Sequence, residues 1–147
     1  MPRDPSLSIP YAPPKFGKTT DVLGAFPRAI YFAAPGALAS AESVLGFDEP
    51  KRYDLETFQE ITEFASSLRA EHIAAVLDDA TIIADRTSAY LVRKGLSGWD
   101  LYGALLRYAT AMCDKLRRQG LHVVMTCHPR AVTWRTACAC TAGLLSP

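Results

Sequence analysis

The residues of this chain that are best suited to chemistry form one run, Ala12-Pro13-Pro14-Lys15-Phe16-Gly17-Lys18-Thr19-Thr20. The run fits the pattern of a phosphate-binding loop, with Ala12 at the position that the first glycine usually holds. A triphosphate requires backbone N–H donors that converge on one point, the N-terminus of a helix, a mobile cation and a hydroxyl group for Mg²⁺. The run offers a residue for each requirement and therefore predicts a site for ATP and Mg²⁺. The alternative is a chance match in a proline-rich turn.

Each residue of this loop has an expected role. Gly17 lets the backbone approach the β-phosphate closely, because a Cβ there would collide with the ligand. We expect Lys18 to face solvent without ligand and to reach the β- and γ-phosphate oxygens, while Thr19 offers its hydroxyl to Mg²⁺. Thr20 is expected to begin the helix. The remaining predicted nucleotide contacts are Pro14, Lys15 and Phe16.

An apolar segment that ends in two acids forms the second candidate constellation. The segment His72-Ile73-Ala74-Ala75-Val76-Leu77-Asp78-Asp79 has the pattern of a strand buried on both faces. At the carboxyl end of a strand beside a phosphate-binding loop, an aspartate can hold Mg²⁺. We predict this role for Asp78, and we expect Asp79 to orient or deprotonate the attacking water. The simpler alternative is a hydrophobic strand that ends in acids without a function.

A third strand-like segment, Leu121-His122-Val123-Val124-Met125-Thr126-Cys127-His128, also ends in polar side chains. A hydroxyl or an imidazole at this strand end can contact the γ-phosphate or the attacking water and report the nucleotide state to neighbouring loops, and we predict this role for His128. A strand-end histidine that hydrogen bonds to backbone explains the pattern as well. The sequence leaves both interpretations open.

The composition of the 147-residue chain restricts the other possibilities. A formal net charge of +1 gives no general attraction to nucleic acid or membranes, so any nucleic-acid contact has to be local. The four cysteines lack Cys-x-x-Cys spacing and the three histidines are scattered, which indicates neither a zinc site nor a disulfide framework. Neither a signal peptide nor an apolar run of about 20 residues is found, so we expect a cytoplasmic protein without membrane contact.

The elements that position these residues alternate between strand and helix patterns, as in a parallel sheet with crossover helices. Pro10 keeps the first strand short, because a central strand needs its amide hydrogen. Asp54 is the expected N-cap of the second helix. The predicted strands cover 7–11, 29–34, 73–77 and 121–126, and the predicted helices cover 19–25, 55–69 and 101–118.

The segment 81–98 combines cations with aromatic side chains. It holds Arg86, Arg93 and Lys94 together with Tyr90, and Trp99 follows directly. Such a mixture can contact phosphates and stack on bases, which makes single-stranded DNA a candidate partner. The alternative is a solvated linker between the strand and the long helix.

Four motifs together resemble the RecA-like P-loop ATPases that bacteriophages and prophages encode. They are the phosphate-binding loop, the acid pair, the helix-opening stretch Trp99-Asp100-Leu101-Tyr102-Gly103 and the strand end Val123-Val124-Met125-Thr126-Cys127-His128-Pro129. The resemblance implies a three-layer α/β P-loop fold over 1–130, with a mainly parallel sheet, helices on both faces, and bound ATP and Mg²⁺. It also implies action on phage DNA in recombination, single-strand annealing or replication, in the cytoplasm of the bacterial host.

Two departures from the family pattern bear on activity. RecA-like ATPases usually place a catalytic glutamate just after the second strand, but Ala33-Ala34-Pro35-Gly36-Ala37 follows here and the nearest acid is Glu42. Hydrolysis would then be slow or would depend on Asp79. The tail 131–147 resembles no continuation of the family.

The resemblance further implies a homo-oligomer, because a basic residue of the next subunit commonly completes such a site. Arg130 and Arg135 are the first candidates, and neighbouring subunits would meet head to tail. Two other functions stay open. One is a hydrolysis-weak nucleotide-binding switch or assembly protein, which the missing glutamate favours. The other is a small-molecule kinase, which needs an arginine-rich lid that only 86–94 could supply.

Overall fold

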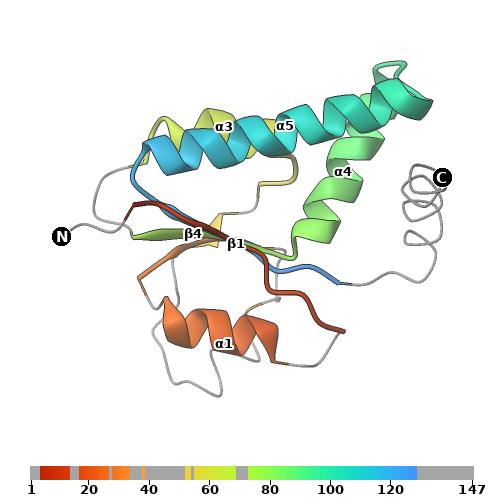
Figure 1. Cartoon of the computed structure of the whole chain (residues 1–147). Helices are drawn as coiled ribbons and strands as arrows, with labels where there is room; N and C mark the ends of the chain where they lie inside the picture. The colour runs from red at the N-terminus through yellow and green to blue at the C-terminus, as the bar shows by residue number, and fades with distance from the viewer. Residues whose placement is uncertain are drawn as a thin grey trace, which may run out of the picture.

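The computed structural model describes residues 4–13, 17–26, 28–33, 38, 52–53, 55–68 and 73–128 (Figure 1). Helices and strands alternate along this part of the chain. The strands are β1 (Leu7–Ser8), β2 (Ile30–Ala33), β3 (Arg52–Tyr53), β4 (Ala74–Asp78) and β5 (His122–Met125). The helices are α1 (Lys18–Ala25), α3 (Phe58–Ala65), α4 (Ala80–Arg93) and α5 (Gly98–Arg118).

The strands form one sheet in the order β1-β5-β4-β2-β3, and every neighbouring pair is parallel. Ala75 of β4 lies opposite Ile30 of β2 on one side and Val123 of β5 on the other. Strand β5 therefore lies between β1 and β4, although β1 and β4 come earlier in the chain. Because all strands run the same way, their carboxyl ends meet at one edge of the sheet.

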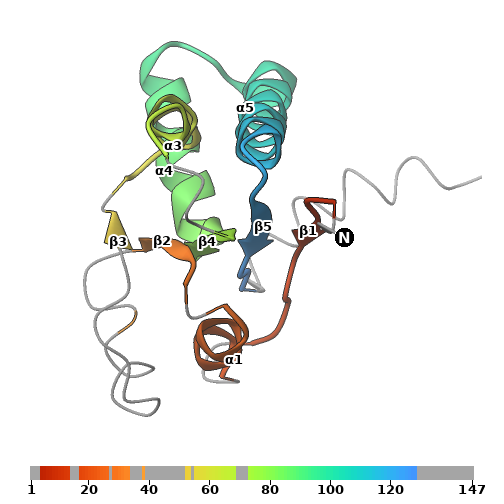
Figure 2. The same cartoon turned by 90° about the vertical axis from the view of Figure 1, so that its left-hand side faces the viewer.

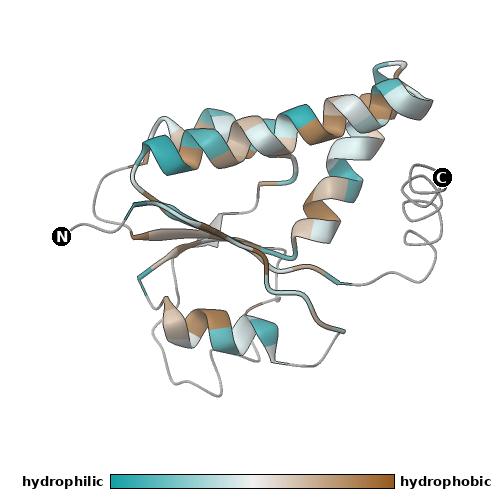
Figure 3. Ribbon diagram, in the orientation of Figure 1, coloured by the Kyte–Doolittle hydropathy of each residue, from teal (hydrophilic) through white to brown (hydrophobic). Residues whose placement is uncertain are grey.

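Helices cover both faces of this sheet, which gives three layers. Figure 2 shows α1 on one face and α3, α4 and α5 on the other. The α/β class, the parallel sheet and the helices on both faces agree with the sequence-based expectation. Figure 3 shows mostly hydrophobic colour along the central strands, as the continuous apolar runs of parallel strands require.

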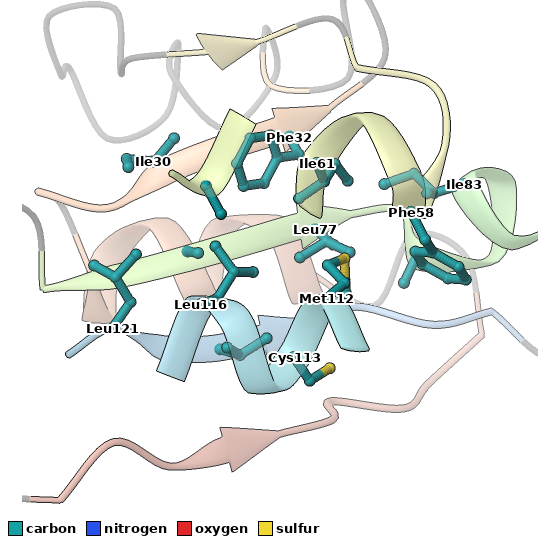
Figure 4. Close-up of a cluster of buried hydrophobic side chains, with 14 residues drawn as sticks. Ile30, Phe32, Phe58, Ile61, Leu77, Ile83, Met112, Cys113, Leu116 and Leu121 are labelled. Carbon is teal, nitrogen blue, oxygen red and sulfur yellow. The ribbon is translucent and has the colours of Figure 1, made fainter. Parts of the chain in front are cut away.

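Alternate residues of the strands feed two separate cores. On the α3/α4/α5 face, a large cluster joins strand residues such as Phe32 and Leu77 to Ile61, Met112 and Leu116 of the helices (Figure 4). On the α1 face, a smaller cluster is built from the following residues: Val22, Leu23, Ala29, Tyr31, Ala33, Leu38, Ala74, Val76 and Val124. Truncating a fully buried side chain of this kind costs about 2–5 kcal/mol of stability. The sheet is thus held rigidly between the layers.

The structure corrects two sequence-based expectations about helices. Helix α3 does not start at residue 55: Thr57 caps it and forms a capping box with Glu60. Asp54, the expected cap, lies outside the described residues. The segment 81–98 is not a linker, because α4 occupies most of it and buries Ile83, Thr87 and Leu91. These three buried residues recur at helical spacing, but the cations of the segment drew attention away from that pattern, so the helix was not predicted.

The other predicted elements are confirmed with small shifts at their ends. Strand β1 is as short as Pro10 required, and beyond it only a bridge between Tyr11 and Cys127 continues the pairing. Strand β3 was not predicted, because two residues carry no periodicity. Within the part of the chain that the structure describes, no helix has the length and apolar character to cross a membrane.

Candidate functional site

The candidate site lies at the carboxyl edge of the sheet, where three segments converge. Helix α1 starts after β1, Asp78 ends β4 and Asp79 follows it directly, and the segment 126–128 follows β5. The sheet order brings them together, because β5 pairs with β1 through Leu7 and Val123 and with β4 through Leu77 and Met125. Residues that are about 50 to 110 positions apart in sequence are neighbours here.

Gly17 caps the N-terminus of α1 in a left-handed conformation, with φ of 79°. A residue with a Cβ is strained at such an angle, so the backbone itself requires glycine here. A Cβ at Gly17 would meet no atom of the described chain within 4 Å. The helix begins at Lys18, so the expectation that Thr20 begins it is wrong by two residues. The predicted contacts Pro14, Lys15 and Phe16 lie outside the described residues.

The side chain of Lys18 is buried, with 9% of its surface exposed, which contradicts the expected solvent-facing orientation. Its ammonium donates to the carbonyl oxygen of Ala12 at 2.6 Å and to that of Pro13 at 2.9 Å. The third contact of the ammonium is Nδ1 of His128 at 3.1 Å. The carbonyl oxygens of Ala12 and Pro13 and the ring of His128 thus supply acceptors to the buried ammonium.

The carboxylate of Asp78 is buried and receives a hydroxyl donor on each oxygen. Thr19 Oγ1 donates to Oδ2 at 2.7 Å, and Thr126 Oγ1 donates to Oδ1. Thr126 is fully buried, and its backbone N–H donates to the carbonyl oxygen of Leu77 at 3.0 Å. The two residues predicted to hold the metal, Thr19 and Asp78, are therefore direct neighbours.

This donor set fits a small hard cation. Mg²⁺ prefers oxygen ligands and is commonly held by one or two protein oxygens together with phosphates and water. Thr19 Oγ1 and Asp78 Oδ2 supply such oxygens side by side. No group of three histidine, cysteine, aspartate or glutamate side chains within the described ranges could hold a metal ion directly.

Asp79 is not a strand residue but the N-cap of α4. Its Oδ1 accepts from the backbone N–H of Thr81 at 2.7 Å, and its Oδ2 lies 3.0 Å from Nε2 of His128. The Thr81 hydroxyl in turn accepts from the backbone N–H of His128 at 3.1 Å. The imidazole of His128 therefore bridges Lys18 and Asp79, so the interpretation in which it bonds to backbone is wrong.

Two residues of the site escaped the sequence analysis. Thr126 orients Asp78, and Thr81 links Asp79 to His128. A hydroxyl residue at the end of the predicted strand 121–126 was a usable signal for Thr126. Thr81 lies two residues after an aspartate, which is the spacing of an N-cap, but α4 itself was not predicted.

Charges at the site affect two neighbouring side chains. Burial raises the pKa of the Tyr31 hydroxyl, and the nearby charge of Asp78 raises it further. Burial also raises the pKa of the Cys127 thiol, and Asp79 adds to that effect, while Thr81 and Lys18 oppose it. Because both groups keep their protons at neutral pH, neither is available as a base or nucleophile.

A groove of about 490 Å³ runs between β1 and α1 and includes Lys18 in its lining. The other lining residues are mostly apolar and come from β1 and the segment after it, from α1 and its C-cap, and from β5: Ser8, Pro10, Tyr11, Ala12, Asp21, Val22, Ala25, Phe26 and Val124. The groove thus gives the buried lysine an open side.

No protein-family model matches the sequence, and no curated protein is significantly similar to it.

Proposed function

We propose that this protein is a RecA-like P-loop ATPase that binds ATP with Mg²⁺ and acts on DNA. The observation that carries the proposal is the contact between Thr19 of the loop and Asp78 of β4, 2.7 Å apart. In P-loop NTPases, the hydroxyl residue after the loop lysine and a strand-end aspartate hold the same Mg²⁺. The position of β5 between β1 and β4 supports the same assignment, because it brings the third polar strand end to the loop.

The residues of the chain have the following roles in this proposal. The N-terminus of α1, with Gly17, receives the phosphates, and Lys18 exchanges its present acceptors for phosphate oxygens. Thr19 and Asp78 would hold Mg²⁺, and a bound Mg²⁺ would supply positive charge beside the phosphates. Thr126 keeps Asp78 aimed at the metal. ATP binding is therefore accompanied by release of Lys18 from the loop carbonyls.

The surface where α4 meets α5 supports a role on single-stranded DNA. Trp99 is 71% exposed and Tyr102 is 57% exposed, and their rings lie edge to face at 6.3 Å. The ammonium of Lys94 lies 5.5 Å from the ring centre of Tyr90. Bases can stack on exposed rings while lysine and arginine contact the phosphates. In this role the protein would act on phage DNA in the cytoplasm of the bacterial host.

A hydrolysis-weak switch is the second candidate function. It is favoured by the way the loop acceptors and His128 already hold Lys18, so that ATP binding changes several contacts at once. The kinase alternative has less support, since Arg86 pairs with Glu56 of the segment before α3 at 3.9 Å. In either proposal a homo-oligomer would add a basic residue, and its candidates Arg130 and Arg135 lie outside the described residues.

ATP turnover with and without single-stranded DNA separates these functions. We expect turnover that requires Mg²⁺ and is stimulated by oligo(dT), with the stimulation shifted to higher oligonucleotide concentrations in Trp99→Ala. Removal of one stacking contact weakens binding about tenfold, so the variant should need about tenfold more oligonucleotide. Leu7→Ala, which removes an exposed apolar side chain on β1, is the matched control. ATP binding without turnover would favour the switch, and no ATP binding would overturn both.

A further inference from the structure

The contacts of His128 fix the position of its proton. The ammonium of Lys18 has only donors, so His128 Nδ1, 3.1 Å away, has to offer it a lone pair. The proton of the neutral ring is then on Nε2, which lies 3.0 Å from Oδ2 of Asp79 and donates to it. In this structure His128 is a neutral imidazole whose single basic nitrogen is occupied by Lys18.

Phosphate binding would free that nitrogen. When Lys18 moves to a phosphate oxygen, Nδ1 of His128 loses its donor and is left at the edge of the phosphate site. Asp79 remains on the other side of the ring, where its carboxylate stabilises an imidazolium. The removal of Lys18 thus turns His128 from an acceptor for lysine into an available base.

Resting on the proposed function, we propose that His128, backed by Asp79, accepts the proton of the attacking water, and that Lys18 blocks it until a triphosphate binds. The water oxygen forms a bond to the γ-phosphorus as the bond from that phosphorus to the β–γ bridging oxygen breaks. The bond electrons leave with ADP, and the water proton moves to Nδ1. The imidazolium returns this proton to solvent, and no other reactant is consumed.

Asp79 is a weaker candidate for the base than His128. Both of its oxygens are already used, Oδ1 by the N–H of Thr81 and Oδ2 by the ring of His128. Serving as the base itself would remove the negative charge that Asp79 places at the N-terminus of α4. We therefore assign Asp79 the role of a positioning residue that acts through His128, in place of the direct contact with water that the sequence suggested.

The remaining groups around His128 define its response to pH. Lys18 faces it from α1, Asp79 and Thr81 face it from the start of α4, and the Cys127 thiol precedes it in the chain. A general base has to be unprotonated to accept a proton, so the role proposed for His128 predicts turnover that falls on the acid side.

The test compares the full-length protein with His128→Gln, His128→Gly and Asp79→Asn, each by steady-state ATP turnover and by ATP binding. General-base catalysis contributes about 10²- to 10⁴-fold, so His128→Gln should lower kcat by at least about 100-fold while ATP affinity changes less than about threefold. Added imidazole should restore part of the turnover of His128→Gly. The fall in turnover on the acid side of the pH profile should be absent in His128→Gln and in His128→Gly. His122→Gln, on the other end of β5, is the matched control and should turn over ATP normally.

The outcomes separate this inference from the proposed function. If the natural protein binds and hydrolyses ATP but His128→Gln keeps more than a third of its turnover, the proposed role of His128 is wrong and the ATPase assignment stands. Equal losses of binding and turnover, with no rescue by imidazole, would make His128 merely structural and also overturn the inference. If Asp79→Asn removes turnover while His128→Gly cannot be rescued, Asp79 is the base instead.

Discussion

The two histidines that flank β5 lie six residues apart and have opposite surroundings. At the amino end, His122 Nδ1 accepts from Ser6, whose backbone N–H is 3.1 Å away and whose hydroxyl oxygen is 2.9 Å away. At the carboxyl end, His128 Nδ1 faces the ammonium of Lys18 and its Nε2 faces the carboxylate of Asp79. Within the described part of the chain, the hydrogen bonds of the His122 ring are to the neutral groups of Ser6, whereas the His128 ring lies between an ammonium and a carboxylate.

This difference comes from the direction of the strands rather than from the histidines themselves. Both rings are half-buried and both accept through Nδ1. A parallel sheet collects every strand's carboxyl end at one edge, and only that edge receives the start of α1 and the acids after β4. The same residue type therefore lies beside a serine at one end of β5 and between a lysine and an aspartate at the other.

The largest expected effect is that of removing Lys18, the cation that distinguishes the carboxyl edge. Lys18→Ala should weaken ATP binding by at least about 100-fold, because each hydrogen bond to a charged group contributes about 1.5–3 kcal/mol. The substitution also leaves three acceptors without their donor, the carbonyl oxygens of Ala12 and Pro13 and Nδ1 of His128. We therefore expect the free energy of unfolding to fall by about 1–3 kcal/mol. Calorimetric titration with ATP and thermal unfolding measure the two effects.

Lys115→Ala, in the last turn of α5, is the control for this experiment. It removes a lysine that lies outside the candidate site and should bind ATP like the natural protein. Unchanged ATP affinity in Lys18→Ala would show that the run is not a phosphate-binding loop. It would also contradict a nucleotide site at the carboxyl edge of the sheet.

A smaller effect is expected at the metal ligand. Asp78→Asn keeps the shape of the side chain but removes the charge that would hold Mg²⁺, so the Mg²⁺-dependent gain in ATP affinity should fall about tenfold or more. Asp114→Asn, on the exposed surface of α5, should leave that gain unchanged. The measurement is ATP affinity across a series of Mg²⁺ concentrations. If the ATP affinity of Asp78→Asn rises with Mg²⁺ as much as that of the natural protein, Asp78 does not hold the metal.

The smallest effect concerns a part of the fold outside both histidine environments. Thr57→Ala breaks the capping box of α3 and should lower the free energy of unfolding by about 1 kcal/mol without changing ATP affinity. Thr110→Ala, on the exposed face of α5, should cost nothing because alanine is the better helix former. Urea unfolding of the three proteins tests the difference. A loss of ATP binding in Thr57→Ala would mean that the site depends on α3.

Local patterns in the sequence were enough to predict four of the five described strands, the helix after the loop motif and the position of the two acids at a strand end. Continuous apolar runs at 73–77 and 121–126 gave the central strands, and the loop motif gave Gly17, Lys18 and Thr19 their place at the start of a helix. Local sequence patterns do not predict the order of the strands in the sheet. That order decides that Lys18, Asp79 and His128 meet, because β5 inserts between β1 and β4.

The errors have local physical causes as well. Lys18 was expected in solvent because lysine usually is, but the loop carbonyls of Ala12 and Pro13 satisfy its charge inside the fold. Helix α4 was missed because its polar and basic residues outnumber the buried stripe of Ile83, Thr87 and Leu91. Because α4 was not predicted, Asp79 was assigned to the end of the strand, and its role as the N-cap of α4 was not recognised.

The most direct test of the account is the NMR signal of each imidazole during titration with ATP and Mg²⁺. Spectra of His122→Gln and His128→Gln assign the two rings, and the chain has only three histidines. We predict that the ring nitrogen signals of His128 shift as Lys18 leaves Nδ1, while those of His122 stay constant. Constant signals from His128 at saturating ATP, or equal shifts from both rings, would contradict a nucleotide site at the carboxyl edge of the sheet.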